Sequence, residues 1–261
     1  MAIVSSSEDP VYDNNFDAKK YLDMFYRIDP KTRQVDKESD FLFTFLNDAF
    51  SSGRVKHKSL IEIGAGPSIH HILPACEYFE KIYITDYLQS NLQEIEKWLR
   101  DSSDAFDWSP YIRYVCILQN TRTTPEESAE KIRRKVSLMK CDVTKTNPLH
   151  PNSLPLTNCL LTVACLTSAC KSFKEFKTAL KNIVSLIKPG GHLILSDYFK
   201  AIYYVVGETK FPLLSLNEDF VKEAVSESGC ETEQFKTFTE IRKPEDLFES
   251  KEVFCLLARK L

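Results

Sequence analysis

The stretch that decides the fold is LIEIGAGPSIHH, residues 60–71. Its apolar start runs directly into Gly64 and Gly66, which predicts a strand followed by a tight turn. Glycine lets the backbone turn sharply and lets a ligand approach without a Cβ in the way. A diphosphate-binding G-x-G-x-x-G loop needs a third glycine at position 69, where this chain has Ile69. The loop therefore favours a ligand without a diphosphate, with a plain tight turn as the alternative.

Strands and helices alternate outward from this loop. Strands are predicted at 59–64, 81–87, 136–143, 159–166 and 192–198, and helices at 17–28, 36–50, 90–100, 172–187 and after Asn217. Asp17 and Asp36 are suited to cap the first two helices, and KPGG at 188–191 is expected to end the helix that begins at 172. The alternation predicts a doubly wound α/β fold with a parallel sheet.

The whole chain, 1–261, is interpreted as a single domain. Residues 1–55 are expected to form an N-terminal helical segment. Residues 101–135 are interpreted as a polar insertion that carries one exposed helix, which Thr124 caps and Pro125 starts.

Composition excludes several classes of function. The 261 residues carry a net charge of −3 with Lys and Arg scattered, which argues against a nucleic-acid partner. No signal peptide or run of about 20 apolar residues is present, so we expect no membrane association and a cytoplasmic location. The eight cysteines form no C-x-x-C pair and several lie in apolar runs, which indicates reduced core thiols and no metal site.

Acidic residues follow the predicted strands. Ligands of parallel sheets bind at the carboxyl ends of the strands, so Asp86, Asp142, Asp197, the 163–167 segment and the glycine loop should surround one cleft. Asp86 lies about 20 residues after the loop, where a carboxylate can accept both hydroxyls of a ribose. These features indicate an adenosine-type ligand. S-adenosylmethionine fits because it has no phosphates, whereas Ile69 argues against an NAD-dependent oxidoreductase.

Several longer stretches carry a family resemblance. They are IEIGAGPSIHHILPACEYF, ITDYLQSNLQEIEKWL, AFDWSPYIRYVC, KCDVT, IKPGGHLILSDYFKAIYYVVGETKF and LLARKL. From about Phe16 to the C-terminus the chain resembles the vertebrate small-molecule N-methyltransferases, a family that includes the nicotinamide, indolethylamine and phenylethanolamine enzymes. Within the family it is most similar to the nicotinamide enzyme. The resemblance implies a class I S-adenosylmethionine-dependent methyltransferase fold, Rossmann-like, with a seven-stranded mostly parallel sheet, an N-terminal helical lid and a monomeric state.

The resemblance also implies the residues that bind the cofactor, S-adenosylmethionine. Tyr21 and Tyr26 would form the lid, and Asp86 would take the ribose hydroxyls with support from Asn91. Asp142 and Val143 would meet the adenine. The other implied contacts are Gly64, Ala65, Gly66, Ser68, His70, Tyr87 and Val163. His70 stands where the family has tyrosine, and Val163 stands where the nicotinamide enzyme has threonine.

The substrate site is implied in the same way. Asp197 would accept a hydrogen bond from a carboxamide, and Tyr204 would pack on a pyridine ring; with Tyr21 they form the implied catalytic set. Tyr198, Ala201, Leu213 and Ala164 are the other implied contacts. Tyr198 replaces an alanine of the nicotinamide enzyme, and Ala201 and Leu213 replace serines.

The expected reaction is transfer of a methyl group to the ring nitrogen of a small pyridine such as nicotinamide. A neutral pyridine nitrogen carries no proton, so positioning would supply most of the catalysis. The alternative substrate is an aromatic alkylamine, which must lose a proton first. A further alternative is a module that binds the cofactor without turnover.

Overall fold

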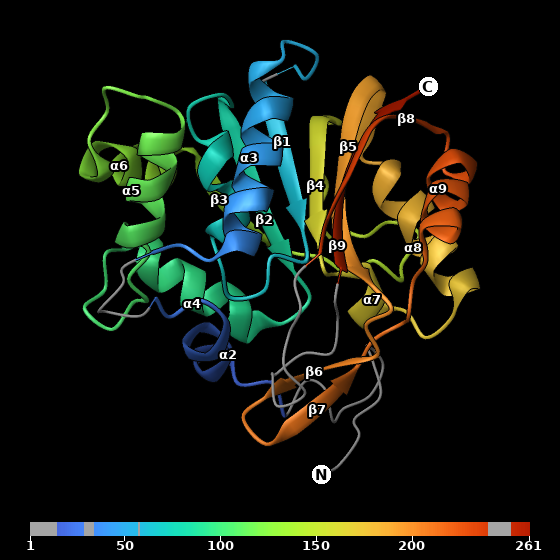
Figure 1. Cartoon of the computed structure of the whole chain (residues 1–261), viewed down its shortest axis with the longest axis horizontal. Coiled ribbons are helices and arrows are strands. Elements are labelled where there is room, and N and C mark those ends of the chain that lie inside the picture. Colours follow the sequence, from blue (N-terminus) through green and yellow to red (C-terminus); the bar gives the residue numbers. More distant parts are fainter. Residues whose placement is uncertain (1–14, 29–33, 57, 240–251) are drawn as a thin grey trace.

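The computed structural model describes residues 15–28, 34–56, 58–239 and 252–261. A seven-stranded sheet in the order β3-β2-β1-β4-β5-β9-β8 crosses the centre of the molecule (Figure 1). Its strands are β1 (Ser59–Ile63), β2 (Lys81–Asp86), β3 (Val136–Lys140), β4 (Thr157–Val163), β5 (Ile187–Phe199), β8 (Cys230–Thr239) and β9 (Glu252–Lys260). The first five pair in parallel, and β9 runs antiparallel to β5 and β8. The predicted doubly wound, mostly parallel sheet is confirmed.

Helices cover both faces of the sheet. They are α2 (Ala18–Phe25), α3 (Lys37–Ser51), α4 (Gln89–Leu99), α5 (Ser109–Leu118), α6 (Pro125–Lys135), α7 (Leu166–Ala169), α8 (Phe173–Val184) and α9 (Glu218–Glu227), with a 3₁₀ helix at His70–Ala75. One core cluster joins α3, α4 and α5 to the sheet, and another joins α8 and α9 to it. Figure 1 shows these two groups of helices on the two sides of the sheet.

Side-chain caps define where several helices begin. Asp17 accepts a hydrogen bond from the amide of Lys20, and Asp36 accepts from the amides of Glu38 and Ser39. Thr124 and Glu127 form a reciprocal capping box before Pro125. Each cap satisfies amides that have no partner inside the helix, which is worth about 1 kcal/mol. The three predicted caps are confirmed.

Two predictions about the helices are wrong. The 101–135 insertion holds two helices, because Trp108, Tyr111, Ile112 and Val115 form an apolar stripe that buries α5 against the core. The helix after Ser172 ends at Val184, before KPGG, because Ile187 already pairs with Thr157 in the sheet. The KPGG segment therefore belongs to β5.

A two-stranded hairpin lies outside the main sheet. It consists of β6 (Tyr203–Val206) and β7 (Thr209–Pro212), joined through Gly207 with φ +61°. The hairpin and α2 lie beyond the carboxyl ends of the parallel strands (Figure 1). Strand order reverses between β1 and β4, and ligands of such sheets bind at that point. The fold thus directs the search for a site to the space between these ends, α2 and the hairpin.

None of the helices within the described ranges is long and apolar enough to cross a membrane.

Candidate active site

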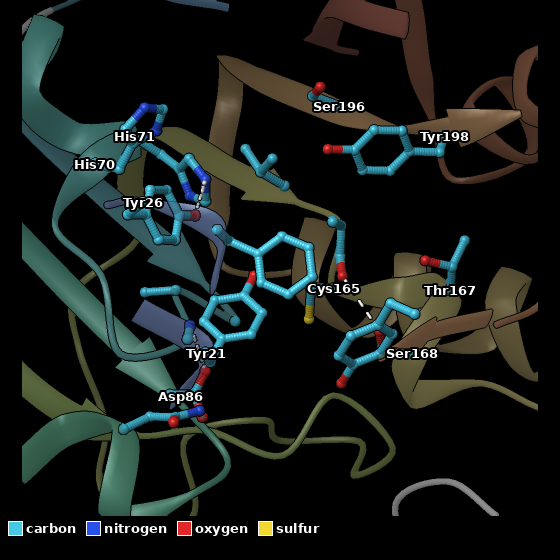
Figure 2. Close-up of a pocket in the computed structure, with 18 of the residues that line it drawn as sticks. Tyr21, Tyr26, His70, His71, Asp86, Cys165, Thr167, Ser168, Ser196 and Tyr198 are labelled. Atoms are coloured by element: carbon cyan, nitrogen blue, oxygen red, sulfur yellow. Dashed lines mark hydrogen bonds between the residues drawn. The ribbon is translucent and has the colours of Figure 1, made fainter. Parts of the chain in front are cut away.

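A cavity of about 870 Å³ opens at the carboxyl ends of β1, β2 and β4. All but three of the residues implied by sequence line it: Tyr21, Tyr26, Gly64, Ala65, Gly66, His70, Asp86, Tyr87, Asn91, Asp142, Val143, Val163, Ala164, Tyr198, Tyr204 and Leu213. Figure 2 shows Asp86 on one side of this space, Ser196 and Tyr198 on the opposite side, and Tyr21 between them. Residues from separate elements therefore meet in one place.

Asp86 is a buried carboxylate at the end of β2. Its Oδ1 accepts from the Leu88 amide at 2.8 Å and from Asn91 Nδ2 at 2.9 Å, and its Oδ2 accepts from the Gly66 amide at 2.8 Å. Burial raises the pKa of Asp86 above its usual value, and these hydrogen bonds offset part of that rise. Asn91 Oδ1 is buried without a hydrogen-bond partner in the described part of the chain. The carboxylate is thus held firmly, and Oδ2 retains capacity to accept from a ligand.

The glycine loop leaves β1 in a left-handed conformation. Gly64 has φ +72°, and a Cβ there would lie 2.2 Å from Cys165 Sγ, so no larger residue fits. Gly66 has φ +63°, and its Cβ would point toward Tyr21, 3.8 Å away. The amides of Gly64 and Ala65 both donate to the carbonyl of Thr85, which ties the loop to β2. The backbone at Gly66 is consequently open toward the cavity, as the sequence predicted.

Two tyrosines of α2 and its C-terminus cover the cavity. Tyr21 lies with its ring 4.7 Å from Phe25 and edge-on to Tyr204 at 6.5 Å. Tyr26 packs edge-on against Trp108 at 5.2 Å, and its carbonyl accepts from the Tyr111 hydroxyl. Burial raises the pKa of Tyr21 to about 12, so its phenol stays protonated at neutral pH. The Tyr21 hydroxyl is therefore a neutral group of the cavity wall.

Two histidines follow the glycine loop. His71 Nδ1 lies 2.8 Å from Glu62 Oε1, and its Nε2 lies 3.4 Å from the Tyr26 hydroxyl. His70 Nε2 lies 3.0 Å from Ser39 Oγ. Burial lowers the pKa of His70 well below its usual value, and His71 lowers it further, so His70 is neutral at pH 7. The pair joins the loop after β1 to Tyr26 and to the start of α3.

The β3 end of the cavity is shaped by a turn. Asp142 Oδ1 accepts from the amide of Thr144 at 3.0 Å and from its hydroxyl at 2.6 Å. The amide of Asp142 donates to Pro148, and the carbonyl of Val143 accepts from Asn182. Oδ2 of Asp142 lies 3.9 Å from the exposed Lys145 ammonium. Asp142 and Val143 thus reach the cavity on the same side as Asp86 and Asn91.

The hairpin supplies an aromatic wall at the other end. Tyr204 stacks on Phe211 with ring centroids 5.2 Å apart and planes 23° apart. Phe211 in turn packs edge-on against Phe16 at 5.8 Å. Leu213 and Tyr198 pack on the same cluster and line the cavity. This end is flat-sided and mostly apolar, which suits a planar aromatic ring.

Ser68, Ala201 and Asp197 are not among the residues that line the cavity, and their predicted ligand contacts stay predictions. Ser68 is fully buried and its Oγ accepts from the His70 amide, which holds the 3₁₀ helix. Ala201 is packed within the hairpin cluster. Asp197 is 1% exposed, with Thr167 Oγ1 at 2.9 and 3.0 Å from its two oxygens.

The alternation of side chains along β5 explains the position of Asp197. Successive side chains of a strand point to opposite faces, and Ser196 and Tyr198 take the cavity face. Asp197 lies between them in the strand, and its carboxyl group accepts a hydrogen bond from Thr167, which lines the cavity. Burial raises the pKa of Asp197 to about 7.

Asp197 should make the folding free energy depend on pH. Its folded pKa of about 7 exceeds the usual aspartate pKa of 3.8, so between these pH values the folded chain binds a proton that the unfolded chain has lost. The contribution of Asp197 to stability is present at low pH and falls as pH rises toward 7. We expect Asp197→Asn to gain on the order of 2–4 kcal/mol relative to wild type between pH 5 and pH 8. Urea unfolding of both proteins at the two pH values measures this, and a constant difference would contradict it.

Sequence reasoning missed several lining residues. Thr167 belongs to the 163–167 segment that was expected at the cleft, and Ser168, the next residue, was not predicted. Glu38 and Ser39 come from the first turn of α3, and no rule about strand ends points there. Within the described residues no group of three or more His, Cys, Asp or Glu could hold a metal ion, and the eight cysteines are free thiols.

The family model described as the NNMT/PNMT/TEMT family matches residues 5–261. The chain belongs to the NNMT/PNMT/TEMT family. The nicotinamide N-methyltransferase of Sus scrofa is 41% identical over 251 residues, which are 96% of this chain and 95% of that protein. The indolethylamine N-methyltransferase of Mus musculus is 37% identical over 221 residues, 84% of each chain.

Solved structures agree on the fold. Magnesium protoporphyrin IX methyltransferase from Synechocystis PCC 6803, with bound S-adenosylmethionine, superposes with a TM-score of 0.60 at 10% identity and covers 96% of this chain and 94% of that one. This member of the NNMT/PNMT/TEMT family therefore has the class I methyltransferase fold and is an S-adenosylmethionine-dependent N-methyltransferase.

Proposed function

We propose that this enzyme methylates the ring nitrogen of a small pyridine such as nicotinamide, with both ligands held in the one cavity. The observation that carries the proposal is the pairing, in a single cavity, of the buried Asp86 carboxylate with the aromatic wall at Tyr204. Relatives 39% and 41% identical over 96% of the chain are named nicotinamide N-methyltransferase, which supports the choice of substrate.

The residues present fit S-adenosylmethionine. Asp86 Oδ2 can accept from ribose hydroxyls, and Asn91 Oδ1 is an unpaired buried acceptor beside it. Gly66 has φ +63° and presents no Cβ toward the cavity. Asp142 and Val143 would hold the adenine, and Gly64, Ala65, Tyr87 and Val163 would pack around the cofactor. When bound, S-adenosylmethionine supplies an electrophilic methyl group on a sulfonium.

The lid and the hairpin would orient the substrate. The Tyr21 and Tyr204 rings stand nearly perpendicular, at 84°, so one can cover the face of a planar ring while the other meets its edge. Tyr21 keeps its phenol proton at neutral pH, so it neither removes a proton nor competes as a nucleophile. A pyridine nitrogen needs no base, and holding it in line with the methyl group can lower the barrier by about 7–11 kcal/mol.

Aromatic alkylamines are the second candidate substrate. The carboxylates of Asp36 and Glu38 line the cavity, and an acid near the nitrogen suits a substrate that carries a proton. The decisive assay offers S-adenosylmethionine with nicotinamide, quinoline, tryptamine or phenylethanolamine. Turnover of the first two supports the proposal, and turnover of the amines alone replaces it with the second candidate. Binding of S-adenosylhomocysteine without turnover of any compound would indicate an inactive module.

Leu213 should limit the affinity for nicotinamide. It lines the cavity at a position where the family resemblance implies a serine, whereas Ala201, the other such position, is buried away from the cavity. Leu213→Ser should lower KM for nicotinamide by roughly two- to ten-fold through one added hydrogen bond. Ala201→Ser is the matched control and should leave KM unchanged. Equal effects of both substitutions would contradict the different placement of these residues.

We also propose a cytoplasmic, monomeric enzyme. Eight free thiols suit a reducing compartment, and the net charge of −3 gives no basis for nucleic-acid binding. Sedimentation at micromolar concentration tests the monomer, and a stable dimer would overturn it.

A further inference from the structure

The cavity has a polar corner at the end that lies opposite Asp86. Ser196 and Tyr198 of β5 form one side of it, and Figure 2 shows the Tyr198 hydroxyl directed into the cavity. Glu38 from α3 lines the same cavity, and the Tyr198 hydroxyl donates a hydrogen bond to its Oε1. A carboxylate thus occupies the end of the cavity where Asp197 was expected to act.

The first turn of α3 is fixed, so the Glu38 backbone is fixed as well. Asp36 Oδ1 accepts from the amides of Glu38 and Ser39 at 3.0 and 2.9 Å. The Ser39 hydroxyl donates to Asp36 Oδ2 and also lies 3.0 Å from His70 Nε2. These contacts anchor the turn to the loop after β1. Glu38 is consequently presented from a rigid helix start rather than from a mobile loop.

Tyr198 connects Glu38 to the aromatic end of the cavity. Its ring packs on the cluster that contains Tyr204 and Phe211, while its hydroxyl reaches Glu38. Glu38 also lies near enough to Tyr21 to help raise the pKa of that phenol, after burial and Asp86. The carboxylate is therefore close to Tyr21, and Tyr198 links it to the cluster that contains Tyr204.

We propose that Glu38, oriented by Tyr198, is the residue that selects substrates by accepting a hydrogen bond from an N–H donor on the aromatic substrate. This inference rests on the proposed function and names the chemical class that the site prefers. The donor is a primary amide attached to the ring, or the protonated amine of an alkyl side chain, which must lose its proton before methyl transfer. Asp197 does not line the cavity itself and is hydrogen-bonded to Thr167, which does.

The chemistry of a carboxylate supports this class of ligand. An ionised carboxylate accepts hydrogen bonds and donates none. Its hydrogen bond to a charged donor is stronger than a hydrogen bond between two neutral groups. A buried N–H group that loses its acceptor is costly, so the site should discriminate against compounds that lack the donor and against variants that lack the acceptor. A ring without a donor, such as quinoline, gains nothing from Glu38.

The test uses two graded substitutions. Glu38→Gln keeps a neutral acceptor of the same shape, and Glu38→Met removes the acceptor while keeping the length. For nicotinamide we expect KM to rise modestly with Gln and about 10- to 100-fold with Met. For tryptamine, KM should rise as much with Glu38→Gln as with Glu38→Met, because both substitutions remove the negative charge that faces the ammonium group. For quinoline KM should change less than two-fold in both variants.

Two controls separate this role from a structural one. Asp40→Asn alters another carboxylate of the same helix, which accepts from the Tyr114 hydroxyl outside the cavity. It should leave every KM unchanged. The affinity for S-adenosylhomocysteine, measured by calorimetry, should be the same in wild type and all variants, since Glu38 lies opposite Asp86. Tyr198→Phe should raise KM for nicotinamide by a smaller factor than Glu38→Met.

The outcomes distinguish two failures. If wild type methylates nicotinamide or tryptamine and Glu38→Met matches Asp40→Asn, the role of Glu38 is wrong and the proposed function stands. If KM for quinoline rises as much as KM for nicotinamide, Glu38 supports the cavity rather than selecting the donor. If wild type methylates none of the compounds, the proposed function fails, and the role of Glu38 fails with it.

Discussion

Asp86→Ala is expected to weaken binding of S-adenosylhomocysteine by at least about 100-fold. The substitution removes the acceptor for the ribose hydroxyls, and two hydrogen bonds to a charged group are worth roughly 3 kcal/mol or more. It also leaves the amides of Gly66 and Leu88 without the carboxylate that accepts from both of them. The glycine loop should loosen, which reduces the affinity further. Isothermal titration calorimetry measures the change.

A milder substitution separates recognition from folding. Asp86→Asn preserves the shape and one acceptor, so its melting temperature should stay close to wild type while its affinity falls clearly. Affinity within two-fold of wild type in both variants would show that the cofactor does not bind at Asp86. A loss of affinity that merely follows a loss of folded protein would show that Asp86 has a structural role.

Gly64→Ala is expected to destabilise the fold by about 3 kcal/mol or more. Its Cβ would lie 2.2 Å from Sγ and 2.5 Å from Cβ of Cys165, and the Cβ of that short, half-buried side chain can move only with its backbone. The left-handed backbone adds roughly 1–2 kcal/mol for any residue with a Cβ. At about 2–4 °C per kcal/mol the melting temperature should fall by roughly 6–12 °C.

Gly229→Ala is the matched control for this substitution. Gly229 also has a left-handed backbone, with φ +85°, but a Cβ there meets nothing within 4 Å. Gly229→Ala should therefore lower the free energy of unfolding only by what a left-handed backbone costs a residue with a Cβ. The difference between the two variants measures the contact with Cys165, and equal melting temperatures would refute the close approach of the loop to the segment after β4.

The sequence predicted the parallel strands well because β1, β2, β4 and β5 are mostly buried, although β3 is partly exposed. The β4 strand is buried along all but its last residue, and such apolar runs stand out against amphipathic helices. The glycine loop and Asp86 were predictable because glycine at a left-handed turn and an acid at the next strand end are local features. Helix caps at Asp17, Asp36 and Thr124 were equally local.

The features that the sequence did not predict depend on long-range packing. The α5 helix looked like part of a polar insertion, yet Trp108 and Tyr111 bury it against Tyr26, 82 to 85 residues earlier in the chain. The side of β5 that faces the cavity depends on strand register, which decides between Asp197 and its neighbours Ser196 and Tyr198. The first turn of α3, which carries Glu38, is held against His70 by Ser39, a contact between residues 31 positions apart. Such contacts leave no local trace in one sequence.

Methyl transfer to a pyridine nitrogen in the Asp86 cavity can be followed with a labelled methyl group. The protein is incubated with S-adenosylmethionine that carries a trideuterated methyl group and with nicotinamide, and the products are separated and identified by mass spectrometry and NMR. We expect S-adenosylhomocysteine and a pyridinium product with the trideuteromethyl group on the ring nitrogen, formed by wild type and strongly reduced in Asp86→Ala at the same cofactor concentration. A label on any other atom, or equal product from both proteins, would contradict the account.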